Sequence, residues 1–525
     1  MALLEVKELT VRIGGTPVLE KISFSIGKAQ RLGIIGQDGS GKSLAALAVL
    51  GLLPDGAEVT GSVSFSEASM PAVEAERAKV RGRRIGMLLQ EARRALDPLR
   101  TIGEHLAQAL THVGATGELK PQIEASLKEV GLDPAMAERL PRDVSDSERQ
   151  LAMLAIALCG KPDLLVADEP TAGLDLPTQR RVLDLIESHC TSRSMALLLI
   201  SKDLKTVAAL CTKIVVLDRG KVVEAGDKAD VFGHPRHEYT RALMAAGRYR
   251  AKTLMRTPIG APLLDVRNVV CRYRQADRSL FEPRQPVTAL DGVTLSIRFG
   301  ESLALIGAAG SGKSTLGRII AGLERATSGE LEFDHEVYHG DDLPRSHRHE
   351  ISYVFTDPLQ SFNPRLTVGE SIAEPLRLQS QLTIEELSAR IVEIVTAVGL
   401  APEMLDRFPH EFIAGDRQRF AIARALITKP RLVVLDEPVA ALDISSRGEL
   451  PVLLNRLRAD FGLTYLVIAD DLEMIRIVAD RVIVMDKGKI IETGTPGQLF
   501  ESPQEPATRT LAAAALPEVG IVPVF

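Results

Sequence analysis

The chain contains the same glycine-rich stretch twice, GQDGSGKS from Gly36 to Ser43 and GAAGSGKS from Gly307 to Ser314. Each copy follows a strand-like apolar run, RLGII or SLALI, and leads into an apolar helical run. Glycines in this context let backbone N–H groups wrap phosphates, while the lysine reaches phosphate oxygens and the serine hydroxyl reaches Mg²⁺. The two copies therefore predict two nucleotide sites of the P-loop type.

The residues expected to bind nucleotide form two equivalent sets. They are Gly36, Gly39, Ser40, Gly41, Lys42 and Ser43 in the first loop, and Gly307, Gly310, Ser311, Gly312, Lys313, Ser314 and Thr315 in the second. Within these sets, Ser43 and Ser314 are also the expected Mg²⁺ ligands, since a serine at this position places its hydroxyl on the metal. ATP and Mg²⁺ are therefore the expected cofactors.

A second motif is repeated at nearly the same offset. LLVADEP runs from Leu164 to Pro170 and LVVLDEP from Leu432 to Pro438, which is 268 positions later, against 271 for the two P-loop lysines. An apolar run ending in Asp-Glu suits a buried strand that delivers two carboxylates at its end. We expect Asp168 and Asp436 to anchor Mg²⁺, and Glu169 and Glu437 to polarise the attacking water.

The near-constant offset indicates two homologous domains. With 525 residues the chain is too long for a single core. Strands alternate with helices in each half, which predicts an α/β fold with a mixed sheet core, and a helix-rich stretch in each half predicts a helical subdomain. We expect a first domain at 1–250, a linker at 251–262 and a second domain at 263–525.

Bulk properties narrow the class of protein. The net charge of −6 gives no general footprint for nucleic acid, so no nucleic-acid partner is expected. No apolar stretch reaches the length of a membrane span, and the first residues, MALLEVKELTV, are strand-like and do not form a signal peptide. We therefore expect an intracellular protein whose contact with a membrane depends on a partner.

Both halves resemble the ATP-binding cassettes of ABC transporters over nearly the whole chain. TAGLD (Thr171 to Asp175) and VAALD (Val439 to Asp443), which follow the DEP motifs, resemble the D-loop. Gln90 resembles the Q-loop glutamine, which implies roles in catalysis and at Mg²⁺. Tyr273 matches the aromatic residue that stacks on adenine in this family, and Ile13 takes that place in the first half.

The ends of the two halves resemble one subfamily, which energises oligopeptide, dipeptide, nickel and related importers. These ends are HPRHEYTRALMAA (234–246) and SPQEPATRTLAAA (502–514), where Glu505 and Ala507 replace the usual His and Tyr. The resemblance implies ATP hydrolysis coupled to import of a peptide, nickel or a similar small solute. It also implies two transmembrane permease subunits, an extracytoplasmic solute-binding protein, and a peripheral position at the cytoplasmic face of the inner membrane.

Two signature loops depart from the family pattern, LSGGQ. The equivalent runs are VSDSE, at 144–148, and FIAGD, at 412–416. Ser145 is retained and is expected to bind nucleotide, whereas Ile413 removes a hydroxyl donor from the second loop. Acidic residues in both loops add repulsion toward a triphosphate, because like charges at contact distance repel by about 1 kcal/mol even in water.

The switch position, normally a histidine, also differs between the halves. Lys202 takes this position in the first half and is expected to act in catalysis as a cation that donates to the γ-phosphate. Asp470 takes it in the second half and, as an ionised carboxylate, only accepts hydrogen bonds. Thr356 replaces the Q-loop glutamine there with a shorter side chain.

Cassettes of this family pair head to tail, which implies that the two halves of this chain pair with each other. Site one would then combine Lys42, Gln90, Glu169 and Lys202 with the FIAGD loop, and site two would combine Lys313, Thr356, Glu437 and Asp470 with the VSDSE loop. We predict that site one carries the turnover and that site two mainly binds. Two alternatives remain open: an ATP-binding regulatory protein with impaired hydrolysis, and a soluble tandem cassette protein acting on ribosomes or DNA, which typically has a charged linker, basic arms or zinc modules that this sequence lacks.

Overall fold

The computed structural model of the protein describes residues 2–66, 68–70, 74–90, 95–246, 259–273, 286–377, 382–440 and 442–516. These residues form two compact units, which divide between helix α10 and strand β11. Most of the linker expected at 251–262 lies outside the described residues. Its last position, Pro262, already begins strand β11 (Pro262–Tyr273).

A six-stranded sheet forms the centre of the first unit, with strand order β10-β9-β3-β8-β7-β6. Neighbouring strands are parallel except at the edge, where β10 runs antiparallel to β9, so the sheet is mixed as expected. The strands are β3 (Arg31–Ile35), β6 (Ile85–Leu88), β7 (Leu164–Asp168), β8 (Ala196–Ile200), β9 (Lys213–Asp218) and β10 (Lys221–Asp227). Every residue of β7 and β8 is buried, which explains their continuous apolar sequences.

An antiparallel sheet of four strands, in the order β2-β1-β4-β5, completes the first unit's β-structure. Its strands are β1 (Ala2–Ile13), β2 (Thr16–Gly27), β4 (Glu58–Phe65) and β5 (Ala68–Ser69). One hydrophobic core contains residues of both sheets and of α1 (Lys42–Leu50), among them Leu4, Ile34 and Val49. Helix α1 therefore lies between the two sheets and directly follows the P-loop.

The helix-rich stretch of the first unit forms α4, α5 and α6 as expected. Helix α4 begins after Thr101, whose hydroxyl accepts from the backbone N–H of Glu104 while the Glu104 carboxylate accepts from the N–H of Thr101. The helices of this unit are α2 (Glu74–Val80), α4 (Ile102–Val113), α5 (Leu119–Glu129), α6 (Asp146–Leu158), α7 (Leu176–Ser192), α8 (Leu204–Leu210), α9 (Lys228–Gly233) and α10 (Glu238–Ala246), with short 3₁₀ helices η1 (Pro134–Glu138) and η2 (Pro141–Asp143).

The second unit repeats this architecture. Its six-stranded sheet has the order β16-β17-β18-β13-β19-β20 and its antiparallel sheet the order β12-β11-β14-β15. The remaining strands are β12 (Val287–Arg298), β13 (Ser302–Ile306), β14 (Ser328–Phe333), β15 (Glu336–Tyr338), β16 (Ile351–Val354), β17 (Leu432–Asp436), β18 (Thr464–Ile468), β19 (Arg481–Asp486) and β20 (Lys489–Gly494). The two-domain α/β fold predicted from the repeat is therefore confirmed.

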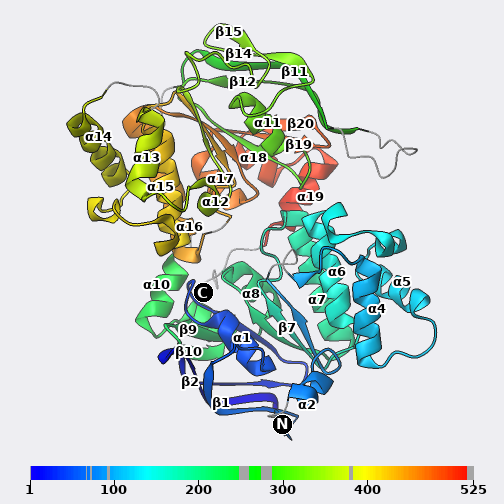
Figure 1. The fold of residues 1–525 in the computed structure, drawn as a ribbon. Helices are drawn as coiled ribbons and strands as arrows, with labels where there is room; N and C mark the ends of the chain where they lie inside the picture. The colour runs from blue at the N-terminus through cyan, green and yellow to red at the C-terminus, as the bar shows by residue number, and fades with distance from the viewer. Residues whose placement is uncertain are drawn as a thin grey trace, which may run out of the picture. The chain divides into compact units, whose positions relative to one another are not determined.

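The helices of the second unit follow the same order. They are α11 (Lys313–Ile320), α12 (Pro358–Ser361), α13 (Val368–Arg377), α14 (Ile384–Ala397), α15 (Ala414–Leu426), α16 (Ile444–Phe461), α17 (Leu472–Val478), α18 (Pro496–Glu501) and α19 (Pro506–Ala514), with 3₁₀ helices η3 (Pro402–Met404) and η4 (Pro409–Glu411). Within this unit, α13, α14 and α15 form a group to one side of the sheet core, away from the antiparallel strands (Figure 1).

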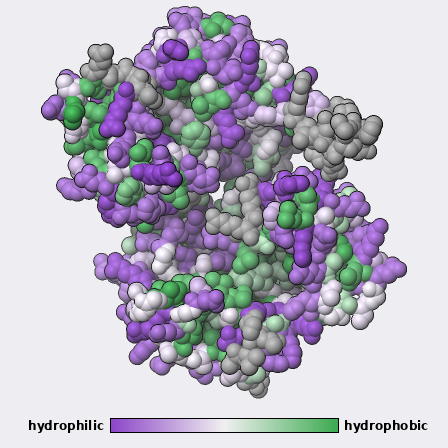
Figure 2. Space-filling view, viewed as in Figure 1, coloured by the Kyte–Doolittle hydropathy of each residue, from purple (hydrophilic) through white to green (hydrophobic). Residues whose placement is uncertain are grey.

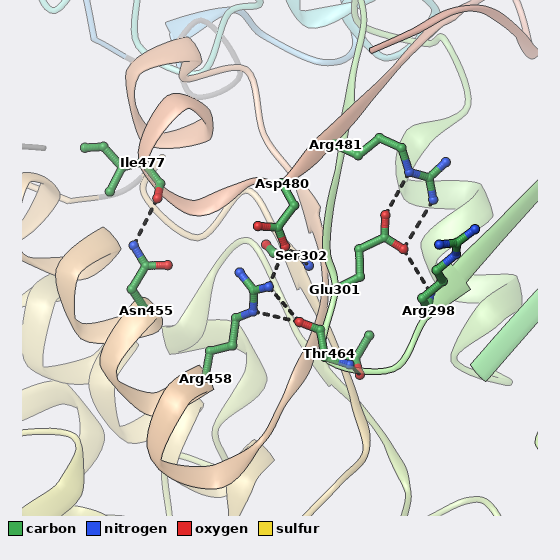
Figure 3. A network of polar contacts seen from close by, with 10 residues as sticks. Arg298, Glu301, Ser302, Asn455, Arg458, Thr464, Ile477, Asp480 and Arg481 are labelled. Carbon is green, nitrogen blue, oxygen red and sulfur yellow. Dashed lines mark hydrogen bonds and ion pairs between the residues drawn. The ribbon is translucent and has the colours of Figure 1, made fainter. Parts of the chain in front are cut away.

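A buried polar network joins α16 to the edge of the second unit's sheet where the parallel strands begin (Figure 3). The Arg458 side chain, only 2% exposed, donates to the carbonyl of Gly300 at 2.6 and 3.0 Å and to the Asp480 carboxylate. Asp480 also accepts from the N–H of Ser302, at 2.9 Å. This network fixes the starts of β13 and β19 and leaves the opposite edge for the nucleotide site.

We predict that Arg458→Ala destabilises the second unit by about 3 kcal/mol, because removing one partner of a buried ion pair leaves the other charge unpaired. Hydrogen exchange of the full chain, followed by mass spectrometry, measures this as faster exchange in β13, β18 and β19. Arg456→Ala, at an exposed position of the same helix, is the control and is expected to cost less than about 1 kcal/mol. Equal effects of the two changes would contradict the account.

Candidate nucleotide-binding sites

Each P-loop has, immediately before its helix, a glycine whose backbone conformation would be strained in any other residue. Gly41 and Gly312 have φ values of 99° and 100° and are the residues immediately before α1 and α11. A Cβ atom at Gly41 would lie 2.6 Å from a Leu19 methyl carbon, and one at Gly312 would lie 2.4 Å from the Ala289 carbonyl oxygen. Neither helix has a side-chain cap, so their first N–H groups are available to an anion.

Each P-loop lysine donates hydrogen bonds to backbone carbonyls at the start of its own loop. The Lys42 ammonium donates to the carbonyls of Gly36 and Gln37, at 2.8 and 2.7 Å. The Lys313 ammonium donates to the equivalent carbonyls of Gly307 and Ala308. Burial lowers the pKa of Lys42, and nearby carboxylates oppose this shift. Both cations are thus held over the loop, where a bound phosphate would meet them.

Two buried serine hydroxyls add to the phosphate-binding character of the loops. Ser40 and Ser311 are 4% and 3% exposed, and neither hydroxyl has a hydrogen-bond partner among the described residues. A buried hydroxyl without a partner is costly, so its presence in both loops fits a bound ligand that supplies acceptor oxygens. Phosphate oxygens are such acceptors.

The acidic pairs lie beside the P-loops at the ends of β7 and β17. Asp168 and Asp436 are the last residues of these strands, and both are buried. Glu169 and Glu437, which follow them, have left-handed backbone conformations, with φ of 47° and 48°. Such conformations are unfavourable for residues with a side chain and cluster at functional sites, which supports the prediction that these two glutamates act in chemistry.

The residues present fit an Mg²⁺ ion. In the second unit the Ser314 hydroxyl donates to an Asp436 carboxylate oxygen at 3.0 Å, so the two expected ligands meet. In the first unit burial raises the pKa of Asp168, while the Ser43 hydroxyl opposes the shift. One Asp168 oxygen is buried without a partner among the described residues. When bound here, Mg²⁺ would polarise the phosphates as a Lewis acid, held by these serines and aspartates.

Site one, at the P-loop of the first unit, has a lysine at the switch position. The backbone N–H of Lys202 donates to a Glu169 carboxylate oxygen at 2.6 Å, and the Ser201 hydroxyl contacts the other oxygen at 3.3 Å. Burial raises the pKa of Glu169 to about 7, although the charges of Lys202 and Lys42 act to lower it. The structure therefore brings the expected base, the switch lysine and the P-loop lysine together.

Site two, at the P-loop of the second unit, has an aspartate at the same position. The Asp470 carboxylate lies 3.4 Å from the Lys313 ammonium. The backbone N–H of Asp470 contacts Glu437 at 3.4 Å. Burial and the neighbouring Asp470 carboxylate raise the pKa of Glu437 to about 8. The P-loop lysine of site two is thus already paired with a carboxylate, which the sequence did not reveal.

Tyr353 is a site residue that the sequence analysis missed. It lies on β16, and its hydroxyl donates to the second Asp436 oxygen at 2.6 Å. Burial and the Asp436 carboxylate raise the pKa of Tyr353, so the hydroxyl stays protonated and acts as a donor. The equivalent position in the first unit is Met87. The only signal in the sequence is this difference between the aligned halves, IGML and ISYV.

The remaining predicted residues lie around these centres. Gln90 and its counterpart Thr356 are exposed, just beyond the ends of β6 and β16. Tyr273, at the end of β11, is 38% exposed, and its hydroxyl lies 3.1 Å from the Thr315 hydroxyl beside the P-loop. The ring is therefore near enough to the P-loop to stay a candidate for adenine stacking, whereas Ile13 offers no aromatic ring.

The first signature loop caps its own helix. The Ser145 hydroxyl accepts from the backbone N–H of Glu148 at 3.2 Å, and the Glu148 carboxylate accepts from both the N–H and the hydroxyl of Ser145 at 2.8 Å. Asp146 forms an ion pair with Arg149. Ser145 and Glu148 thus satisfy groups at the start of α6 that an anion would otherwise bind, and Asp146 and Glu148 add negative charge there. To bind nucleotide as predicted, the Ser145 hydroxyl would have to give up its hydrogen bond to Glu148.

The second signature loop has no side-chain cap at the start of α15. Its first position, Ile413, is 58% exposed. Burial raises the pKa of Asp416, and the nearby Arg419 opposes the shift. The two loops therefore depart from the family pattern in different ways. In VSDSE the donors at the start of α6 are occupied by the loop's own side chains, and in FIAGD the serine hydroxyl is lost.

The end segment of the first unit contacts its P-loop. The backbone N–H of Gln37 donates to the Tyr239 hydroxyl oxygen at 2.8 Å. The Glu224 carboxylate fixes this segment by accepting from the N–H groups of Arg236 and His237. In the second unit Glu492 docks the corresponding segment in the same way. Ala507 stands at the position of Tyr239, so that unit lacks the same support for its P-loop.

Comparison with known proteins identifies the family of the chain. A family model described as ABC transporter matches residues 19–172 and 290–440. The glutathione import ATP-binding protein GsiA of Escherichia coli K12 is 36% identical over 94% of this chain and 86% of that protein, and the protein of the same name from Shigella sonnei matches equally. A solved dimeric ATP-binding cassette in a post-hydrolysis state, bound to ADP and Pi, is 28% identical over 45% of this chain and 99% of that chain, with a TM-score of 0.40.

The two P-loop units thus define a tandem pair of ATP-binding cassettes. The chain belongs to the ABC transporter family, as an ATP-binding ATPase subunit whose activity is coupled to transport.

We predict that kcat/KM for ATP hydrolysis rises about tenfold between about pH 6 and pH 8, because Glu169 with a pKa of about 7 accepts a proton only when ionised. Lys202→Met removes a positive charge that favours the carboxylate, so the midpoint should move to higher pH. Steady-state assays across this range measure both effects. The exposed Lys213→Met is the control and should leave the midpoint in place; a flat profile for the unmodified protein would rule out Glu169 as the titrating base.

Proposed function

We propose that this chain is the ATP-hydrolysing subunit of an importer for peptides or similar small solutes, working with two transmembrane permease subunits and an extracytoplasmic binding protein. The observation that carries the proposal is the presence of two P-loop sites, each with an Asp-Glu pair at the end of a buried strand beside the lysine. The relatives named for glutathione import, together with the end segments docked by Glu224 and Glu492, support the importer class.

The proposed permease contacts lie beside the Q-loop positions. Large apolar side chains are exposed there in both units: Leu89 (38%) and Leu99 (82%) near Gln90, and Phe355 (40%) and Leu359 (41%) near Thr356. On the visible face, apolar areas of several sizes lie among hydrophilic ones (Figure 2). Among the described residues no helix is long and apolar enough to cross a membrane. A peripheral subunit at the cytoplasmic face of the inner membrane is consistent with these observations.

The proposed reaction is hydrolysis of ATP to ADP and phosphate. Water attacks the γ-phosphorus, the bond to the bridging oxygen of ADP breaks, and Glu169 takes the proton of the water. Lys42 and Lys202 place two cations beside the charge that develops on the phosphoryl oxygens, which is where electrostatic stabilisation acts. Site two has one lysine, and that lysine is paired with Asp470.

We therefore propose that site one carries the turnover and that site two binds nucleotide with little hydrolysis. From the family resemblance we infer that the two cassettes pair when nucleotide is bound. The VSDSE loop occupies donors with its own cap, and the FIAGD loop has Ile413 where the family has a serine hydroxyl. Both changes favour a slow enzyme, because each removes a donor that the family uses for the γ-phosphate.

We predict that Glu169→Gln lowers kcat for ATP hydrolysis at least about 100-fold, since it removes the base, whereas Glu437→Gln changes kcat less than about threefold. The assay uses the full chain with and without permease subunits. Both substitutions keep size and shape, so each is the matched control for the other. Greater loss from Glu437→Gln would reverse the assignment of the two sites, and an absence of turnover in every form would favour the regulatory alternative.

A further inference from the structure

We infer that site two is a nucleoside-diphosphate site, in which the Asp470 carboxylate occupies the surroundings of the third phosphate and favours ADP over ATP. This inference rests on the proposed function, because it assumes that the second P-loop binds nucleotide. It goes further by assigning a ligand class to one of the two sites.

The geometry at the P-loop lysine is the first support. The Lys313 ammonium lies 3.4 Å from the Asp470 carboxylate, with side chains that are 8% and 23% exposed. The same ammonium donates to the carbonyls of Gly307 and Ala308. P-loop lysines bridge the β- and γ-phosphates, so a γ-phosphate would compete with a carboxylate that is already in place. When a diphosphate is bound, the Asp470 carboxylate can keep the Lys313 ammonium as its partner.

The balance of charge is the second support. In site two one ammonium, that of Lys313, faces the carboxyl groups of Asp436, Glu437 and Asp470. In site one two ammonium groups, on Lys42 and Lys202, face three carboxyl groups, those of Asp38, Asp168 and Glu169. ATP carries an additional phosphoryl group and additional negative charge compared with ADP. That charge meets a cation at the switch position of site one and a carboxylate at the switch position of site two.

The expected Mg²⁺ ligands give the third support. Both carboxylate oxygens of Asp436 already accept hydrogen bonds, from Ser314 at 3.0 Å and from Tyr353 at 2.6 Å. One oxygen of Asp168, the equivalent residue of site one, is buried without a partner among the described residues. Ser43 contacts Asp168 as Ser314 contacts Asp436, so the difference between the sites is the Tyr353 donor. An Mg²⁺ ion held by Asp436 would have to share an oxygen with Tyr353, so site two would gain less from a metal-bound triphosphate than site one does.

The test measures equilibrium binding of ADP and of the non-hydrolysable triphosphate AMP-PNP, each with Mg²⁺, to the full chain. Lys42→Ala removes a phosphate contact of site one, so one nucleotide per chain reports on site two. We expect ADP to bind at least about fivefold more tightly than AMP-PNP, which is the effect of one unscreened like-charge contact in water. Adding Asp470→Asn should remove most of this preference by tightening AMP-PNP binding.

The reciprocal variant keeps the inference testable if Asp470→Asn fails to fold. In a Lys313→Ala chain, which isolates site one, Lys202→Asp introduces a carboxylate at the switch position and should create an ADP preference of similar size. Lys202→Met in the same chain is the control. It should lower the affinity for AMP-PNP, but its preference for ADP should be smaller than that of Lys202→Asp.

Three outcomes distinguish the possibilities. A preference for ADP in the Lys42→Ala chain that is lost with Asp470→Asn supports the inference. Equal or tighter binding of AMP-PNP in the Lys42→Ala chain overturns it while leaving the proposed function standing. Failure of both single-site chains to bind either nucleotide overturns the inference together with the proposed function.

Discussion

The parallel pairing of the central strands is the constraint on which both nucleotide sites depend. In each unit the P-loop, the Asp-Glu pair and the switch residue follow three neighbouring strands, β3, β7 and β8 or β13, β17 and β18. Parallel strands end at one edge, so residues more than a hundred positions apart meet there. The opposite edge of the second unit is fixed by Arg458 and Asp480.

Given this arrangement of strands, we propose that the residue at the switch position after β8 or β18 accounts for most of the difference between the two sites. Lys202 adds a cation beside Glu169, whereas Asp470 takes the P-loop lysine as its partner and raises the pKa of Glu437. The arrangement of strands around the P-loop is thus the same in both units, whereas the charged residues beside the P-loop lysine differ. An asymmetric ATPase, with one site for turnover and one for retention of nucleotide, is the function that agrees best with these contacts.

Much of the fold and of the phosphate-binding centre was predictable because it depends on local patterns. The two P-loops, the DEP strands and the helical stretches each carry their signal within a few residues. The bond between Tyr353 and Asp436 was not predictable, since it joins side chains 83 positions apart through strand pairing. The capping box of Ser145 and Glu148 is visible in the sequence as S-x-x-E, a pattern that predicts a helix start at this loop. The family motif LSGGQ has no acidic residue at the position of Glu148, so alignment with that motif does not predict the cap.

The most direct test of this asymmetry is trapping with vanadate and a photoreactive azido-ATP, followed by mapping of the labelled peptides in the assembled transporter. Vanadate with ADP mimics the transition state, so it is retained only where hydrolysis proceeds. The account predicts that the label added by vanadate, relative to the same reaction without vanadate, lies on the first unit, beside the first P-loop. Label on the second unit should not depend on vanadate, because that site retains nucleotide without hydrolysis. Equal vanadate-dependent labelling of both units, or vanadate-dependent label confined to the second, would contradict it.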